Sequence, residues 1–296
     1  MNAVFEPSLL FIADEDWWDE EKRDAFLEHL LDHLQLIDEY DICQIWWTEQ
    51  LQTILVGDPN MHPWFGSDQR NPLIVNIHQK FYQRLSYWGE HPLPCDIMPA
   101  LSADYSNLSA QESSLKLVHA LMEQEENFHF CVGLANQLKP AAAYSFSCSC
   151  HSYRLLPNVI NQASEWLPLL DPVAQFFPTS IEDFDTHFPK ALELVLRQNF
   201  PGKPYLFDFE FSKTFKKSVI SRTTFRREIL EAVVKKLIST TEESRLDLKD
   251  EFIDRKKEWR FRVTPRPHST RIQYTVEGKT INFLQYFGEG EHDDGL

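Results

Sequence analysis

The chain has 296 residues, of which 43% are hydrophobic and 13% aromatic, so it can bury ordinary cores and is not a disordered polymer. Its length favours two domains over one. No run of about 18 uncharged apolar residues occurs, so no membrane-spanning helix is predicted, and the start lacks the pattern of a secretory signal. Five cysteines in so long a chain favour a reduced, cytoplasmic protein over a disulfide scaffold.

The charge is distributed unevenly along the chain. The formal net charge of −16 argues by itself against nucleic-acid binding, because acidic surfaces repel phosphate. Residues 1–202, however, carry 10 Lys+Arg and 29 Asp+Glu, whereas residues 203–296 carry 19 and 16. The change of sign falls at Pro201-Gly-Lys-Pro204. We therefore predict an acidic domain over 1–200 and a mildly basic domain over 204–296.

The acidic part has mixed strand and helix patterns, which favours an α/β domain. Apolar or alternating runs predict strands at 8–13, 41–47, 72–77, 127–133 and 143–149. Helical spacing predicts helices at 19–36, 109–124 and 180–200. The second of these helices opens with the capping box Ser109–Glu112 and the third with Ser180–Asp183.

Two clusters in this part have residue types that can bind metal. One cluster follows the first predicted strand, a place where Mg²⁺ ligands lie in nucleases: Asp14, Glu15, Asp16, Asp19, Glu20 and Glu21. The favoured interpretation is that these acids stabilise the dipole of the next helix. Cys148, Cys150 and His151 resemble half a zinc site, but their spacing and the lack of a second pair nearby argue against zinc. We therefore predict no metal.

The basic part has a clear element order. Alternation over 205–211 predicts a strand, and apolar spacing predicts helices at 212–219 and 225–238. A polar connection over 239–257 leads to strands at 258–264, 270–276 and 280–287. This order predicts an α+β domain, β-α-α-β-β-β, in which two helices cover an antiparallel meander. The uncovered face would carry Arg260, Arg262 and Arg271.

This last third resembles the RelE/ParE superfamily of small bacterial toxins. The resemblance rests on "FDFEFSKTFKK", "FRREILEAVVKKLI", "EWRFRV…RIQYTVEGKTINFLQYFG" and the tail "GEGEHDDGL", in that order. It implies a metal-independent endoribonuclease without a cofactor, which acts on ribosome-bound mRNA. In such enzymes the ribose 2′-OH attacks the adjacent phosphate, so the site needs a base, an acid and cations.

The resemblance also implies roles for single residues. Arg260, Arg262 and Arg271 match the phosphate-binding positions, and guanidinium groups suit them because they bind phosphate in a bidentate manner. His292 matches the histidine of the tail and is the group with a suitable pKa for proton transfer. Asp293 or Asp294 would orient the His292 ring, and Lys256 and Lys257 would extend the RNA path.

We therefore expect a cytoplasmic mRNA interferase fused to an acidic regulatory domain, in a toxin–antitoxin or anti-phage defence setting. Its partners would be mRNA and the ribosome, with inhibition by an antitoxin or by residues 1–200, and with no membrane. One alternative is a non-catalytic interaction subunit of RelE/ParE fold, which uses the arginine-bearing surface for docking. Another places a Mg²⁺-dependent enzyme at Asp14–Glu21. The oligomeric state stays open.

Overall fold

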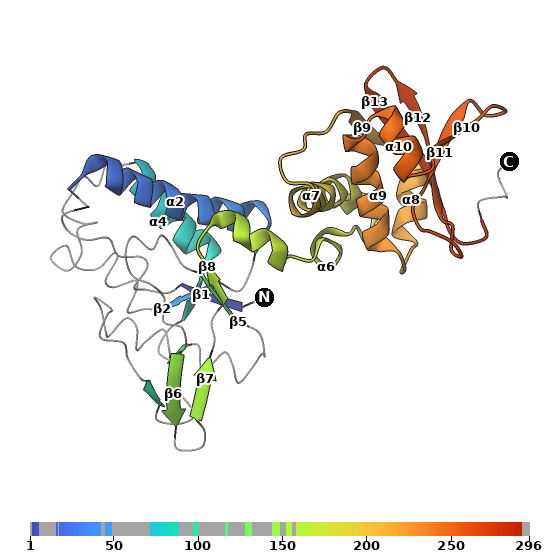
Figure 1. The fold of residues 1–296 in the computed structure, drawn as a ribbon. Coiled ribbons are helices and arrows are strands. Elements are labelled where there is room, and N and C mark those ends of the chain that lie inside the picture. Colours follow the sequence, from blue (N-terminus) through green and yellow to red (C-terminus); the bar gives the residue numbers. More distant parts are fainter. Residues whose placement is uncertain are drawn as a thin grey trace. The chain divides into compact units, whose positions relative to one another are not determined.

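The computed structural model describes residues 2–5, 16, 18–42, 45–48, 72–88, 97–99, 116–117, 128–131, 144–148, 152–155 and 158–291 (Figure 1). The chain forms two compact units: unit 1 is Met1–Trp166 and unit 2 is Leu167–Leu296. No helix of the described residues has both the length and the apolar character needed to cross a membrane.

Unit 1 contains a five-stranded parallel sheet. Its order is β3-β2-β1-β5-β8, formed by β1 (Asn2–Phe5), β2 (Ile45–Thr48), β3 (Ser86–Trp88), β5 (Phe128–Cys131) and β8 (Asn158–Ile160). All four neighbouring pairs are parallel. A second, antiparallel sheet has the order β4-β6-β7, formed by β4 (Ile97–Pro99), β6 (Tyr144–Cys148) and β7 (Ser152–Leu155). Strands together with helices agree with the predicted α/β class.

Two helices of unit 1 lie side by side (Figure 1). Helix α2 (Glu20–Glu39) buries an apolar stripe that includes Phe26, Leu27, Leu30, Leu34 and Ile37. Helix α4 (Pro72–Arg84) buries Ile74, Ile77 and Phe81. The Asp38 carboxylate of α2 accepts a hydrogen bond from Lys80 Nζ of α4 at 2.8 Å. Apolar packing and this ion pair together join the two helices.

The strand predicted at 72–77 is wrong, because this segment begins α4. Leu73, Ile74, Val75 and Ile77 have the composition of a strand, but Ile74, Ile77 and Phe81 are spaced for one helix face. The Phe81 ring stacks on the buried Trp47 ring at 5.1 Å. The strands predicted at 41–47, 127–133 and 143–149 correspond to β2, β5 and β6. The strand at 8–13 lies outside the described residues, as does the helix at 109–124 except for residues 116–117.

Unit 2 opens with helices that the charge pattern had assigned to the acidic part. The 3₁₀ helix η3 (Ala163–Leu169) spans the division between the two units, and α6 (Pro172–Phe176) and α7 (Ile181–Asn199) follow it in unit 2. The predicted capping box of α7 is confirmed: the Asp183 N–H donates to Ser180 Oγ, and the Ser180 N–H donates to the Asp183 carboxylate.

The domain boundary predicted at 201–204 differs from the division at Trp166 and Leu167. Aromatic packing explains the difference, because Phe184 and Phe188 of α7 contact the rings of Phe211 and Phe215 in the basic part. The shift changes the charges of the two parts. Unit 1 carries 8 Lys+Arg and 24 Asp+Glu, whereas unit 2 carries 21 of each and has no formal net charge.

The sheet of unit 2 has the order β10-β11-β12-β13-β9. It contains β9 (Asp208–Phe211), β10 (Glu251–Ile253), β11 (Glu258–Arg262), β12 (Arg271–Glu277) and β13 (Thr280–Phe287). Its strands are antiparallel except for β9, which runs parallel to β13. Helices α7, α8 (Lys213–Ile220) and α9 (Arg226–Ile238) gather on one side of the sheet (Figure 1). They bury the apolar side chains of its inner face, among them Phe261, Ile272, Ile281 and Phe283.

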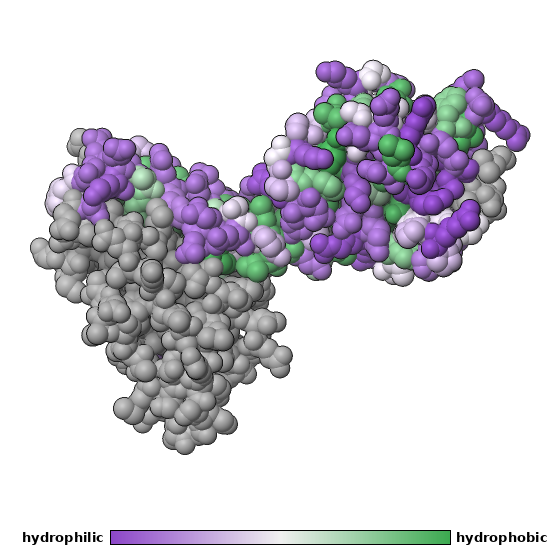
Figure 2. Space-filling view, viewed as in Figure 1, coloured by the Kyte–Doolittle hydropathy of each residue, from purple (hydrophilic) through white to green (hydrophobic). Residues whose placement is uncertain are grey.

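The polar connection predicted over 239–257 is wrong in part, because it contains helix α10 (Thr241–Asp247) and strand β10. Thr240 and Glu243 form the capping box that begins α10. The predicted order β-α-α-β-β-β is therefore extended by one helix and one strand, and α7 also covers the sheet. What the structure bears out is a domain of helices packed on a mixed sheet. Its visible outer surface is mostly hydrophilic (Figure 2).

Candidate functional site

Strands β11 and β12 bring three guanidinium groups to one face of the sheet in unit 2. Arg260 and Arg262 alternate with the buried Phe261, so both lie on the face that the helices leave uncovered. Arg262 pairs in register with Arg271, and Arg260 pairs with Gln273. We call Arg260, Arg262 and Arg271 the arginine face. The sequence predicted that these residues share a face, and the register agrees.

A carboxylate from β10 lies against two of these arginines. Glu251 pairs in register with Arg260, and its Oε1 accepts hydrogen bonds from Arg260 Nε and from Arg271 Nη1. The arginine side chains are only 15% and 14% exposed, whereas that of Glu251 is 43% exposed. Sequence reasoning missed Glu251, since it lies in a segment predicted to be irregular. The carboxylate partly neutralises the cluster and holds two guanidinium groups in place.

The third arginine is joined through its backbone to the segment that carries a further cation, Lys249. The Arg262 N–H donates to the Leu248 carbonyl at 2.8 Å, which places the preceding segment along β11. Lys249 follows directly with a left-handed φ of 53°, a conformation that costs a non-glycine residue about 1 kcal/mol. Sequence reasoning missed Lys249 as well, and no local signal marks it.

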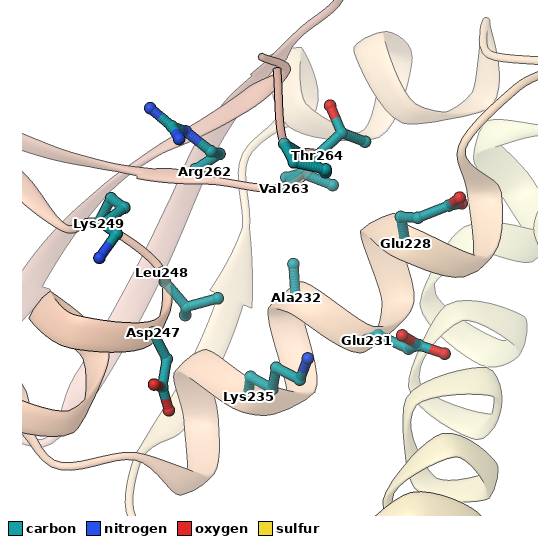
Figure 3. Close-up of a pocket in the computed structure, with 11 residues that line it drawn as sticks. Glu228, Glu231, Ala232, Lys235, Asp247, Leu248, Lys249, Arg262, Val263 and Thr264 are labelled. Atoms are coloured by element: carbon teal, nitrogen blue, oxygen red, sulfur yellow. The ribbon is translucent and has the colours of Figure 1, made fainter. Parts of the chain in front are cut away.

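A groove of about 310 Å³ opens between α9 and the end of β11. Arg262 and Lys249 lie on its strand side, and Glu228 and Glu231 lie on its helix side (Figure 3). Lys235 and Asp247 add one charge of each sign to its lining. The residues that line the groove therefore carry charges of both signs. The groove lies on the side of β11 that faces α9, so it is separate from the arginine face.

Two buried guanidinium nitrogens show that some hydrogen-bond donors of the arginine face have no acceptor in the described part of the chain. Arg260 Nη1 and Arg262 Nε are buried, and neither has a hydrogen-bond acceptor among the described residues. A buried donor without an acceptor costs about 1–3 kcal/mol. An anion placed on this face would supply the acceptors that the protein does not.

A second polar cluster lies on the opposite side of β10. Lys236 Nζ donates to Asp250 Oδ2 at 2.5 Å and to Ser244 Oγ at 3.0 Å. The same Asp250 oxygen accepts from Ser244 Oγ at 2.7 Å and from the Tyr274 hydroxyl at 2.9 Å. Burial lowers the pKa of Lys236, an effect that Asp250 opposes, and burial with the Asp250 charge raises the pKa of Tyr274. This cluster attaches β10 to α9, α10 and β12.

The tail that carries the predicted histidine begins next to the arginine face, because Phe287 pairs with Arg271. His292, Asp293 and Asp294 themselves lie outside the described residues. Glu291 is the last residue described. Its carboxylate accepts from Arg222 Nη2 and from the Gly288 N–H, and the Arg222 contact lowers the pKa of Glu291. The predicted proton-transfer group therefore follows a segment that Arg222 holds.

Another imidazole, which sequence reasoning missed, lies near this tail. His268 Nδ1 is 3.1 Å from Glu289 Oε2, and its ring lies 4.9 Å from that of Phe225. The sequence feature that could have pointed to His268 is its position three residues before Arg271. Lys256 and Lys257 are exposed in the turn between β10 and β11, at the opposite end of β11 from Arg262. They are accessible, but they do not join the cluster of arginines.

The candidate sites of unit 1 have structural roles where they are described. Asp19 caps α2 by accepting from the N–H groups of Glu21 and Lys22, and Asp16 pairs with the Lys22 ammonium at 2.5 Å. Glu20 and Glu21 lie exposed in the first turn. Of the remaining members of the two clusters, Cys148 ends β6, and Asp14, Glu15, Cys150 and His151 lie outside the described residues. Among those described, no group of three or more His, Cys, Asp or Glu could hold a metal.

Comparison of the chain with protein-family models finds no match, and comparison with curated proteins finds no recognisable relative.

Proposed function

We propose that unit 2 binds the phosphate backbone of RNA through the arginine face and cleaves it without a metal, as the RNA-cleaving toxins resembled by its sequence do. One observation carries the binding part. Arg262 and Arg271 lie directly opposite each other on neighbouring strands, although like charges in such pairs destabilise a sheet by about 0.2–1 kcal/mol. The unsatisfied guanidinium nitrogens add to this cost. A ligand with several negative charges would offset both.

The chemistry expected of this site divides between binding and proton transfer. Arg260, Arg262 and Arg271 would hold the phosphate and stabilise the additional negative charge of the transition state. Guanidinium groups stay protonated at any working pH, so they cannot act as the base. His292 is the proposed base for the 2′-OH, with Asp293 or Asp294 orienting its ring. His268, paired with Glu289, is a second imidazole available for proton transfer.

The binding step is tested with a labelled single-stranded RNA 12-mer and the full chain. Arg260→Ala, Arg262→Ala and Arg271→Ala are each expected to weaken binding about tenfold, and to reduce the dependence on salt by about 0.7 released ion per lost phosphate contact. Lys213→Ala is the matched control, because Lys213 is an exposed cation on α8. Equal affinity of all four variants and the wild type would refute RNA binding by this face.

The cleavage step is tested with translating ribosomes. His292→Ala is expected to abolish mRNA cleavage and growth arrest while leaving RNA affinity within about twofold, because it removes a base and not a phosphate contact. His268→Ala is compared beside it, so that the two imidazoles are separated. Cleavage that persists in both variants would exclude the proposed proton transfer. Cleavage lost on chelation of divalent metals would instead favour the enzyme at Asp14–Glu21.

A role for unit 1 follows from its charge of −16, which is the whole formal charge of the chain. We propose that it restrains the basic site or responds to a signal, in a toxin–antitoxin or anti-phage setting in the cytoplasm. A covalently attached domain acts at an effective concentration of about millimolar. Removal of residues 1–166, which keeps α7 in unit 2, is expected to increase RNA cleavage or toxicity. Unchanged activity would exclude restraint.

The contact between Glu251 and two arginines supports a second candidate function, a subunit that binds a partner without catalysis. With Arg260 and Arg271 partly neutralised, the face could dock on an acidic protein surface. A wild-type chain that neither cleaves mRNA with ribosomes present nor binds the 12-mer would favour this alternative.

A further inference from the structure

The Glu251 carboxylate occupies the place on the arginine face where a phosphate oxygen would bind. One oxygen, Oε1, accepts from a guanidinium nitrogen of Arg260 and from one of Arg271. Phosphate oxygens bind guanidinium groups in the same way. Glu251 is also the most exposed of the three side chains. A ligand approaching these two arginines therefore meets the carboxylate first.

Neighbouring residues hold this carboxylate in position. Asp250 precedes Glu251 and is bound by Lys236, Ser244 and Tyr274 on the inner side of the sheet. The Asp250 side chain is 1% exposed and that of Lys236 is 6% exposed, so the attachment of β10 is thoroughly buried. The strand cannot leave without breaking these bonds. Release of the arginines therefore requires rotation of the Glu251 side chain alone.

Glu251 does not bond the other two cations, Arg262 and Lys249. Among the described residues, no ion pair or hydrogen bond joins Glu251 to Arg262 or to Lys249. A strand with several phosphates can contact Arg262, which lies opposite Arg271, while Glu251 is still in place, and can then exchange for Glu251 on Arg260 and Arg271. An isolated phosphate has no such first contact and competes directly with a tethered carboxylate.

We infer that Glu251 is an internal competitor that makes the arginine face selective for polyanions, namely adjacent phosphates of single-stranded RNA, over isolated anions. This inference rests on the proposed function of the face. It assigns Glu251 a role in specificity that its position in a short edge strand does not suggest.

Glu251→Gln tests the inference in the full chain, because the amide keeps the shape and removes the charge. The affinity for the labelled RNA 12-mer is expected to rise about tenfold, since a competing charge-assisted contact is lost. Inorganic phosphate is expected to show line broadening in phosphorus NMR with Glu251→Gln but not with the wild type. Glu277→Gln is the matched control, because Glu277 is an exposed acid at the far end of β12.

Glu251→Asp provides a second variant if the glutamine variant fails to fold. Its shorter side chain keeps the charge but cannot reach both arginines equally, so an intermediate gain in RNA affinity is expected. RNA affinity that is unchanged or lower in both variants, compared with Glu277→Gln, overturns the inference. The proposed function fails separately if Arg260→Ala together with Arg271→Ala leaves wild-type RNA affinity unchanged.

Discussion

The two faces of the sheet at β10 carry clusters of opposite kinds. On the inner face, Lys236 and Asp250 form a buried pair whose contacts also include Ser244 and Tyr274. On the outer face, the Glu251 carboxylate bridges two of the three arginines, Arg260 and Arg271. The inner cluster is balanced in charge and closed to solvent, so it can stabilise the fold but cannot meet a ligand. The outer cluster has excess positive charge, and the Glu251 side chain that lies on it is partly exposed, so this cluster can meet a ligand.

The largest effect that this comparison predicts is on stability. Lys236→Ala leaves the Asp250 carboxylate buried without its cation and is expected to destabilise unit 2 by about 3–5 kcal/mol. Hydrogen exchange of α9 and α10 in the full chain measures the loss. Lys235→Ala, at the exposed neighbouring position, is the control and is expected to stay within about 0.5 kcal/mol. If both variants lowered the stability by a similarly small amount, the Lys236 cluster would not have the stabilising role that distinguishes the inner face from the outer face.

The same reasoning extends to a buried histidine of unit 1. Trp166 Nε1 donates to His33 Nδ1 at 3.1 Å, and His33 Nε2 lies 3.3 Å from both His29 Nε2 and the Asn161 carbonyl. Burial, and to a smaller extent His29, lowers the pKa of His33 from 6.5 to about 4. The folded state therefore favours the neutral ring, and the unfolded state binds more protons between these two values.

Stability of unit 1 should be fully present above about pH 6.5 and should fall by about 3 kcal/mol as the pH decreases to about 4. Urea unfolding followed by tryptophan fluorescence measures the fall, because seven of the eight tryptophans lie in unit 1. His33→Gln should flatten this part of the pH profile, and an unchanged profile would exclude His33 as its cause. Because the cluster is buried, RNA affinity should not change with this substitution.

A smaller and opposite effect on stability is expected at the outer face. Arg262→Gln removes one of two like charges across β11 and β12, so unit 2 should keep its stability or gain up to about 0.5 kcal/mol. The same substitution should weaken RNA binding about tenfold. Thermal unfolding and RNA anisotropy are compared on one preparation. A clear loss of stability would place Arg262 among the structural residues instead.

The smallest effect is predicted for the turn between β10 and β11. Lys256→Ala and Lys257→Ala should each weaken RNA binding less than about threefold, because exposed cations outside the cluster attract phosphate only through screened charge. The effect should vanish at high salt. A loss as large as that of Arg271→Ala would extend the binding site to this turn.

Several elements could be predicted because their signals are local. The capping box of Ser180 and Asp183 marks the start of α7, and the alternation from Trp259 to Arg262 marks β11 and the face of its arginines. The strand predicted at 72–77 was wrong because a short apolar run fits a strand and a helix equally well. The burial of Ile77 and Phe81 in unit 1 favours the helix. Strand β10 was not predicted because three residues are too few to show the alternation of a strand.

The sequence by itself determined which residues form the meander and that three arginines share its outer face, because side-chain alternation follows from the strand backbone alone. Only the tertiary structure decided that Glu251 bridges two of these arginines, that the Leu248 carbonyl bonds the backbone of the third, and that α7 belongs with the sheet. Those features depend on strand register and on aromatic packing between segments distant in the chain. Contacts of this kind are set by the pairing of whole elements, which no local pattern specifies.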